Sequence, residues 1–530
     1  MLATARIPRT LWFWGLLIWT TSSAWGQSRL DQLLTAPERT NFETTSTYEE
    51  VVSFIETAAA ASERLHLSSF GYSLEGRSLP LVVFGDLDDA SAASIYKSGK
   101  LRVFIQANIH AGEVCGKEAL LMMIRDMALG KYDDLAQELV VIMAPIYNAD
   151  GNERVNLFNR PRQNGPYGGM GQRPNAQGLD LNRDHMKVKS PEARSLIGLF
   201  NEYDPHVVVD LHTTNGTRHA YHITYSTPLN PNTDRNIDSF LRDRWMKDVT
   251  ATIKSRIGWD YYYYGNLPYR QGEAGWYTFD HRPRFNNNYV GLRNRMAILS
   301  EGYAYATFEE RILATRYFVE EILSFASDNS KVIAQMVEVA DNVDLKGSEL
   351  GVRFAPHMNE ASTDILMGDV YTETNPYSGA TYFNRKDTVY TQTMPNYGAF
   401  EATETSRVPD TYYVDKKAAD VVSSYLDTHG IAYSVVSTTR SLVAEAFAIT
   451  TSDVSKNEFQ QIFEREINGA YAQTEVTLEP GSLIIDTNQP LARLLFYLIE
   501  PRSDDGLVDW AILDKWVEVG SIYPVFRSVE

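Results

Sequence analysis

Short, continuously apolar runs alternate with amphipathic segments from about residue 45 to residue 328. Apolar runs of this length are typical of strands that are buried on both faces of a sheet. The predicted strands lie at 79–86, 101–109, 138–146, 206–212 and 296–302. The amphipathic segments predict helices at 47–64, 118–129, 191–202 and 307–327. This alternation predicts an α/β fold with a mixed, mostly parallel sheet that helices cover on both faces.

The regular pattern lapses in two places. Residues 147–189 are rich in Gly, Asn, Pro and Arg, and long ordered loops of this kind usually serve function. After about residue 340 strand and turn signals dominate, and 412–436 has the order strand, helix, Gly C-cap, strand. Because 530 residues exceed one ordinary core, we expect a first domain at 45–328 and a smaller α/β domain at 345–530.

The N-terminus has the features of an export signal. Arg6 and Arg9 precede a short apolar run at 11–19, and small residues near Gly26 offer a cleavage site. The run is too short to cross a bilayer, although a retained membrane anchor is the alternative. Since no later segment is apolar for long enough, we expect a signal peptide at 1–26, a secreted or periplasmic protein and no stable membrane anchor.

Charge and cysteine content narrow the classes of partner and site. The formal net charge of −19 argues against nucleic acid or an anionic membrane surface as a partner, because both need a basic patch. The single cysteine, Cys115, excludes an internal disulfide. It lies at the start of a predicted helix, where a small buried apolar side chain is favoured over a catalytic or metal-bound thiol.

Polar residues that can bind a metal follow two of the predicted strands. His110 ends the strand at 101–109, and Glu113 opens the next helix, so both side chains can converge on one point. His212 ends the strand at 206–212. Catalytic zinc takes three protein ligands and keeps a position open for water. A lone histidine at a strand end is more often a core residue, but two of them with a spaced glutamate favour a metal site.

A second His-x-x-Glu pair, His357 and Glu360, tests how specific this pattern is. We predict that this pair lies on the surface, in an irregular stretch with no preceding strand. Three further histidines near the predicted site could be structural or could line the cleft: His206, His219 and His222.

Glu301 ends the strand at 296–302, and a hydrolase needs a base that takes a proton from the metal-activated water. The long loop adds an anion-binding set, because arginine forks bind carboxylates and asparagine adds an uncharged donor. Its basic and amide residues include Arg154, Arg160, Arg162, Arg173, Asn182 and Arg183. For Arg154 and Arg162 we favour salt bridges that tether the loop.

These residues resemble the zinc metallocarboxypeptidases of the carboxypeptidase A type. The resemblance covers roughly 45–328 and rests on motifs in the family's order. These are "YSLEGRSLPLVVFG", the His-x-x-Glu at 110–113, "NADG" (148–151), "GLDLNRD" (178–184), "VDLH" (209–212) and Glu301. The C-terminal region, with "LIEPRSDDGLVDW" (498–510), resembles the accessory domain of some bacterial members.

The resemblance implies a role for each site residue. His110, Glu113 and His212 would ligate one zinc ion per chain. Glu301 would be the general base, and Arg173 would polarise the scissile carbonyl. Arg173 is preferred over Arg160 and Arg162 because its interval to Asn182 matches the compact form of the motif. Asn182 and Arg183 would bind the free C-terminal carboxylate of a peptide substrate.

The chain also departs from the family's pattern. Tyr277 and Tyr289 are the candidates for a tyrosine over the bound substrate, and neither spacing matches well. The specificity-pocket residue falls within 282–295, where the side-chain preference stays open. No prosegment of domain size precedes residue 45, so we expect no activation by proteolysis.

The sequence thus predicts a secreted or periplasmic zinc carboxypeptidase that hydrolyses the C-terminal peptide bond with a metal-activated water. The alternative enzyme keeps the same zinc site and is an amidase or deacylase on cell-wall peptides or acyl-amino acids. A third class is a non-catalytic peptide-binding protein, which should lack a ligand or the base; all are present here.

Overall fold

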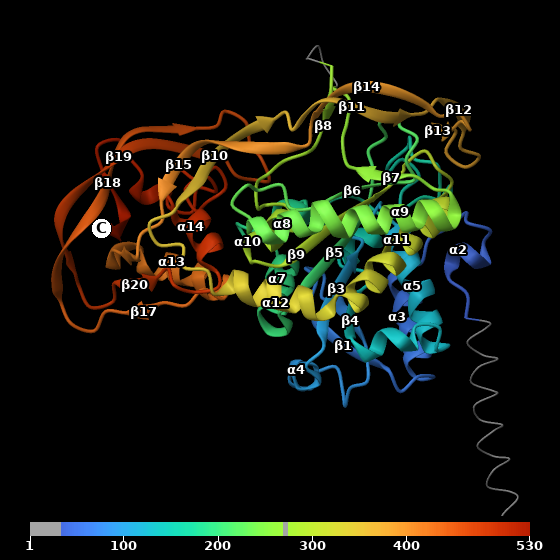
Figure 1. Ribbon diagram of the computed structural model, residues 1–530, viewed down its shortest axis with the longest axis horizontal. Coiled ribbons are helices and arrows are strands. Elements are labelled where there is room, and N and C mark those ends of the chain that lie inside the picture. Colours follow the sequence, from blue (N-terminus) through green and yellow to red (C-terminus); the bar gives the residue numbers. More distant parts are fainter. Residues whose placement is uncertain (1–32, 269–273, 530) are drawn as a thin grey trace, which may run out of the picture.

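A computed structural model describes residues 33–268 and 274–529 of the chain (Figure 1). The predicted signal peptide at 1–26 lies outside the described residues. Within them, no helix combines the length and the apolar character that a membrane crossing requires.

An eight-stranded mixed sheet forms the centre of the first part of the chain, in the order β1-β2-β4-β3-β5-β9-β6-β7. Neighbours β4-β3, β3-β5, β5-β9 and β6-β7 are parallel, and the other pairs are antiparallel. The strands are β1 (Leu65–Tyr72), β2 (Ser78–Phe84), β3 (Leu101–Ala107), β4 (Leu139–Ala144), β5 (Val207–Thr213), β6 (Ile223–Ser226), β7 (Tyr261–Tyr263) and β9 (Met296–Gly302). The five strands expected from apolar runs are confirmed.

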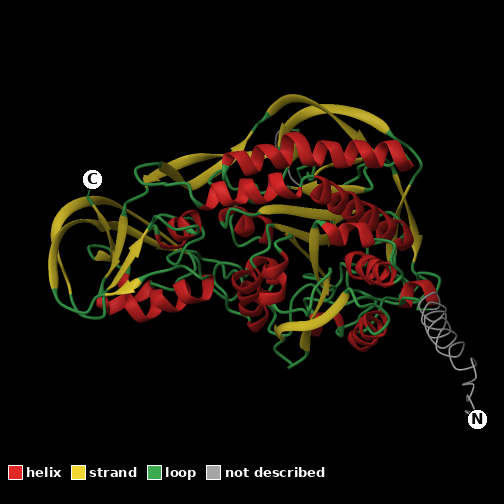
Figure 2. Cartoon of the chain, turned by 60° about the horizontal axis from the view of Figure 1, so that its bottom comes forward, coloured by secondary structure: helices red, strands yellow, loops and turns green. Residues whose placement is uncertain are grey.

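Helices cover both faces of this sheet (Figure 2). They are α2 (Ala36–Arg39), α3 (Tyr48–Ala59), α4 (Ala92–Ser98), α5 (Cys115–Ala128), α7 (Pro191–Tyr203), α8 (Arg235–Phe240), α9 (Met246–Ile257), α10 (Asn286–Leu292), α11 (Phe308–Asp328) and α12 (Ser330–Asp341). Local signals set their ends: Thr47 and Glu50 form a capping box on α3, and Ser190 caps α7 with Pro191 in its first turn.

The long segment between β4 and α7 is irregular, as expected. It contains only the one-turn helix α6 (Ala149–Asn152) and the 3₁₀ turn η2 (Leu181–Arg183). Asn148 ties this segment to the sheet edge, because its side-chain amide donates to the carbonyl oxygens of Ile109 and Arg173, each at 3.2 Å. The start of the loop is therefore fixed to the chain that leaves β3.

After α12 the chain forms narrow ribbons that return to the first part (Figure 1). Strand β10 (Glu349–His357) pairs with β15 (Ala399–Arg407), β12 (Val370–Thr374) with β13 (Thr381–Arg385), and β11 (Glu360–Met367) with β14 (Tyr390–Tyr397). Strand β14 then pairs in parallel with β8 (Trp276–Tyr277). The predicted boundary at 345 stays a prediction, and the ribbon contacts residues on both sides of it.

A six-stranded sheet contains the remaining strands, in the order β17-β20-β16-β21-β18-β19. Its elements are β16 (Thr411–Val414), α13 (Lys416–His429), β17 (Ser434–Val435), β18 (Arg440–Val454), β19 (Arg465–Leu478), β20 (Leu483–Asp486), α14 (Ala492–Ile499) and β21 (Ile522–Ser528). Gly430 ends α13 with φ 77°, which confirms the predicted glycine cap. This sheet and its helices form the smaller α/β unit expected near the C-terminus.

The prediction for the second His-x-x-Glu pair was wrong in one respect. His357 ends strand β10 and Glu360 begins β11, so the stretch is not irregular. Both side chains are exposed, and the Nδ1 atom of His357 lies 3.2 Å from an oxygen of Glu401. The second half of β10 and the start of β11 are exposed or half-buried, which hides this ribbon from a search for continuous apolar runs.

Candidate metal centre

The adjacent parallel strands β3, β5 and β9 bring the predicted site residues to one edge of the sheet. Asp210 on β5 is in register with Gln106 on β3 and Leu299 on β9, so the carboxyl ends of the three strands coincide. The chain leaves β3 through Asn108, whose φ of 67° is a left-handed conformation that asparagine tolerates. His110 and Glu113 follow in this turn, and His212 lies at the end of β5.

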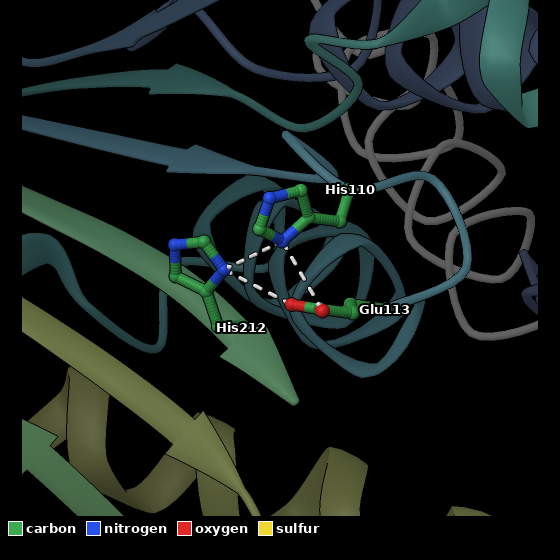
Figure 3. A group of neighbouring side chains, drawn as sticks. All are labelled: His110, Glu113 and His212. Carbon is green, nitrogen blue, oxygen red and sulfur yellow. Dashed lines mark hydrogen bonds and ion pairs between the residues drawn. The ribbon is translucent and has the colours of Figure 1, made fainter. Parts of the chain in front are cut away.

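His110, Glu113 and His212 form a compact, buried group (Figure 3). One ligand atom from each lies within 4.8 Å of the other two. The Nδ1 atoms of the two histidines are 3.2 Å apart, and the two Glu113 oxygens lie 3.1 Å from His110 Nδ1 and 3.0 Å from His212 Nδ1. Side chains from the turn after β3 and from the end of β5 therefore direct their ligand atoms to one point.

Each histidine uses its other ring nitrogen for a carboxylate. His110 Nε2 lies 3.0 Å from Asp180 Oδ1, and His212 Nε2 lies 2.9 Å from Asp210 Oδ2. Histidines that bind metals usually donate this second nitrogen to a carboxylate or carbonyl, which fixes the ring and leaves Nδ1 free to ligate. Both rings are thus oriented for a metal on the Nδ1 side.

The charges around Glu113 keep its carboxylate ionised. Burial alone would raise its pKa, but His110 and the Arg160 guanidinium hold the pKa well below its usual range. The pKa of His212 is well above its ordinary value, since Asp210 and Glu113 outweigh the effect of burial. A group that combines two imidazoles with one ionised carboxylate is the donor set of a three-ligand catalytic zinc site, so the residues fit the metal.

Glu301 lies beside this group on the next strand. It is in register with His212 across the β5–β9 ladder. Burial raises its pKa to about 8, while His212 opposes the shift. Its Oε2 atom accepts no hydrogen bond from the residues that the structure describes. The carboxylate is therefore close to the metal group and available to exchange a proton.

The two central arginines of the loop occupy different positions. Arg160 Nη1 lies 2.8 Å from Glu113 Oε1, and its Nη2 donates to the carbonyl oxygens of Thr213 and Thr214. Arg173 lies farther out, with Nη2 2.8 Å from Asp180 Oδ2 and Nη1 3.6 Å from Glu113 Oε1. Arg160 is thus engaged with Glu113 and the end of β5, whereas the Arg173 side chain is 38 % exposed.

A cavity of about 180 Å³ opens beside Arg160. Thr214, Asn215, Ala304 and Tyr305 line its other side. Because Thr214 follows His212 by two residues, this cavity adjoins the metal group on the side of Arg160.

Asn182 and Arg183 lie in the turn η2, next to His212 and Phe285. The Asn182 amide nitrogen is 3.5 Å from His212 Nε2, and its Oδ1 accepts a hydrogen bond from the backbone of Asn286 at 2.8 Å. The Arg183 guanidinium lies over the Phe285 ring, 3.7 Å from its centroid. Burial lowers the pKa of Arg183 to about 10, so the side chain stays cationic at neutral pH.

Four of the remaining candidates have structural contacts. His206 accepts a backbone hydrogen bond from Arg102, and burial lowers its pKa to about 3. His222 stacks on Trp259 with a 4.4 Å separation of ring centroids. Tyr289 is wholly buried and its hydroxyl lies 2.8 Å from His429 Nδ1, so it cannot cover a substrate. Cys115 is buried with Sγ 3.1 Å from the Thr213 hydroxyl, which confirms a packed thiol.

Two residues of the site were missed. Asp180 lies two positions before Asn182, and its place in "GLDLNRD" was the available signal. Gln460, from the C-terminal region, accepts a 2.8 Å hydrogen bond from the Asp180 backbone. No local signal marks Gln460, because its partner is 280 residues away along the chain.

Comparison with known proteins agrees with this geometry. The family model described as zinc carboxypeptidase matches residues 51–280. The chain is 25 % identical over 486 residues to carboxypeptidase 2 of Trichophyton equinum, covering 86 % of this chain and 81 % of that protein. It is 24 % identical over 510 residues to carboxypeptidase 2 of Trichophyton rubrum, covering 90 % of this chain and 86 % of that protein.

Two solved carboxypeptidase structures align with about half of this chain. A metallo-carboxypeptidase from Burkholderia cenocepacia aligns with 54 % of this chain and 70 % of its own, at 15 % identity and a TM-score of 0.41. Carboxypeptidase A from Helicoverpa armigera aligns with 55 % of this chain and 75 % of its own, at 17 % identity and a TM-score of 0.41. These comparisons make the chain similar to zinc carboxypeptidases, and the stretch matched by the family model contains His110, Glu113 and His212.

Proposed function

We propose that the protein is a zinc-dependent carboxypeptidase that hydrolyses the C-terminal peptide bond of peptides. The observation that carries this proposal is the group of His110, Glu113 and His212, which lies inside the stretch that the zinc carboxypeptidase model matches. Glu301, just beyond that stretch, is in register with His212. The three residues of the group would hold the zinc ion. When bound, zinc supplies a Lewis acid that polarises the scissile carbonyl and acidifies a water molecule.

Glu301 is the general base of the proposed reaction. Its Oε2, which has no hydrogen-bond partner among the described residues, takes a proton from the attacking water and later passes that proton to the leaving amine. The raised pKa supports this role, because a carboxyl group that binds a proton near neutral pH can both accept and return one.

Arg173 donates to the oxygen of the scissile carbonyl as negative charge develops there. Its partial exposure and its ion pair with Asp180 support this role, since Asp180 fixes the guanidinium while part of the side chain stays accessible. Arg160 is less suited, because Glu113 and two carbonyl oxygens already engage its guanidinium.

Asn182 and Arg183 bind the free carboxylate of the substrate. Arg183 offers a cation that Phe285 supports from one side, and the Asn182 amide adds an uncharged donor. Only a chain terminus carries a carboxylate at this place, which makes the enzyme an exopeptidase.

The alternative, an amidase or deacylase with the same zinc site, is not favoured. The family description and the names of the relatives both indicate carboxypeptidases. Export to the periplasm or the medium belongs to the proposal as well, on the strength of the basic and apolar N-terminal segment.

A digest of a peptide library with free and amidated C-termini tests the proposal. The purified, zinc-loaded protein should release single residues from free C-termini and leave amidated peptides intact, and chelation should abolish the release. Cleavage of acyl-amino acids with no release from unblocked peptides would favour the alternative enzyme. An active protein without metal would refute the role of zinc.

A further inference from the structure

A two-residue turn of the C-terminal region contacts the segment that carries Asn182 and Arg183. Phe459 and Ile462 exchange backbone hydrogen bonds of 2.8 and 3.0 Å, and Gln460 and Gln461 form the turn between them. The Gln460 Oε1 atom accepts the hydrogen bond from the Asp180 backbone N–H at 2.8 Å. The Gln461 Nε2 atom donates to the Gln177 carbonyl oxygen, also at 2.8 Å.

The backbone of this turn is strained. Gln460 and Gln461 have φ values of 50° and 63°, and such turns favour asparagine and glycine because other side chains crowd the left-handed backbone. Non-glycine residues in left-handed conformations persist where the surrounding structure holds them, and they concentrate at functional sites. The strain presents both glutamine side chains to the loop at 177–180.

A buried ionic network anchors the turn. The Arg284 guanidinium lies 5.2 Å from the Phe459 ring centroid and 4.3 Å from that of Trp510. Its nitrogens reach carboxylate oxygens of three acids of the C-terminal region at 2.7 to 2.8 Å: Glu464, Asp505 and Asp509. The turn is therefore fixed to the segment that leads into α10, which also contacts Asn182 through Asn286.

Asp180 is the point where the turn meets the site. Its side chain contacts His110 Nε2 and Arg173, and its Oδ1 accepts from the Asn182 backbone at 2.9 Å. The backbone N–H of Asp180 donates to Gln460, so the contact with the turn leaves the Asp180 carboxylate to His110 and Arg173. A shift of Asp180 would displace both carboxylate-binding side chains that follow it.

We propose that Gln460 is a positioning residue, through which the C-terminal region holds the Asp180–Arg183 segment in the geometry that binds the substrate's carboxylate. The inference rests on the proposed function, because it assigns the carboxylate to Asn182 and Arg183. It gives the C-terminal region a part in the site through its contact with Asp180.

The test compares Gln460→Met with Gln461→Met in the full-length, zinc-loaded protein. Methionine keeps the length of glutamine and removes its hydrogen-bonding atoms. In Gln460→Met, the Michaelis constant for a peptide with a free C-terminus should rise about fivefold, the weight of one typical hydrogen bond, with kcat within about twofold. Hydrogen exchange of the Asp180 amide should accelerate by a similar factor. Gln461→Met should leave both quantities unchanged.

Two outcomes would overturn the proposal. One is an unchanged Asp180 exchange rate in Gln460→Met, and the other is an equal response in both variants, which would mean that the turn is merely structural. If Gln460→Met fails to fold, Gln460→Glu is measured instead. Glutamate keeps an oxygen that can accept from the Asp180 N–H, so this amide should stay protected against hydrogen exchange, and loss of the protection would contradict the proposal. A wild-type protein without carboxypeptidase activity would refute the proposed function, while the exchange measurements would still decide the role of Gln460.

Discussion

The edge of the central sheet and the C-terminal region both contact Asp180, through His110 and Gln460, but their side chains are held in place in different ways. At the sheet edge, His212 and Glu301 are placed by the backbone ladder of parallel strands. In the C-terminal region, Gln460 and the partners of Arg284 are placed by side-chain contacts between distant parts of the chain. A ladder tolerates the change of one side chain, whereas a network of side chains depends on each member. Single substitutions at the sheet edge should therefore change the rate of the reaction, and those in the C-terminal region should change the free energy of unfolding.

The largest effect is expected from Glu301→Gln at the sheet edge. Glutamine keeps the shape of the side chain but cannot take up a proton, so kcat should fall by about 10²–10⁴-fold. Zinc content, measured by metal analysis, and the free energy of unfolding should stay unchanged, since the ladder places this residue. The control is Glu309→Gln, an exposed glutamate in the first turn of α11. Turnover near the wild-type rate in Glu301→Gln would remove this residue from the reaction.

The next effect is expected from Arg284→Met, in the network of the C-terminal region. The side chain of Arg284 is 1 % exposed and pairs with three acids. Its removal leaves buried carboxylates without a cation and should cost about 3–5 kcal/mol in the free energy of unfolding by urea. Arg39→Met, at an exposed ion pair with Glu50, should cost about 0–1 kcal/mol.

The pH dependence of the Arg284→Met defect follows from Asp505. Burial raises the pKa of this carboxyl to about 6, and losing the nearby arginine should raise it further. A folded-state pKa above the unfolded value favours folding at low pH, and this contribution is lost as pH rises through the folded pKa. The destabilisation should thus be smaller at pH 5 than at pH 8. An equal loss of unfolding free energy at pH 5 and pH 8 would mean that Asp505 keeps its charge without Arg284.

The sheet edge was predictable because its signals are local. Each predicted strand is a continuous apolar run, and His110, His212 and Glu301 each lie at the end of such a run. The order of the parallel strands brings these ends together without further information. Asp180 was within reach as well, because it shares a short motif with Asn182.

The rest of the fold lacks such signals. The helices α8, α9 and α12 were not predicted, and α9 buries only Met246, Val249 and Ile253 against the protein. The strand that ends at His357 was missed because its exposed side chains break the apolar pattern. The contact of Gln460 with Asp180 depends on how two distant regions pack, and neither segment's composition encodes it.

Asp180→Asn would separate the effect of the Asp180 side chain on His110 from the effect of Gln460 on the Asp180 backbone. Asparagine keeps the backbone N–H for Gln460 but removes the charge that faces His110 Nε2 and Arg173. Outer carboxylates of this kind typically contribute 10–100-fold to metal affinity, so the dissociation constant for zinc should rise by about that factor in a competitive chelator titration. Asp88→Asn, at an exposed carboxylate, is the control. Gln460→Met removes only the contact with the Asp180 backbone, so it should leave the zinc affinity unchanged. If it weakens zinc binding as much as Asp180→Asn does, the C-terminal region acts on His110 rather than on Asn182 and Arg183.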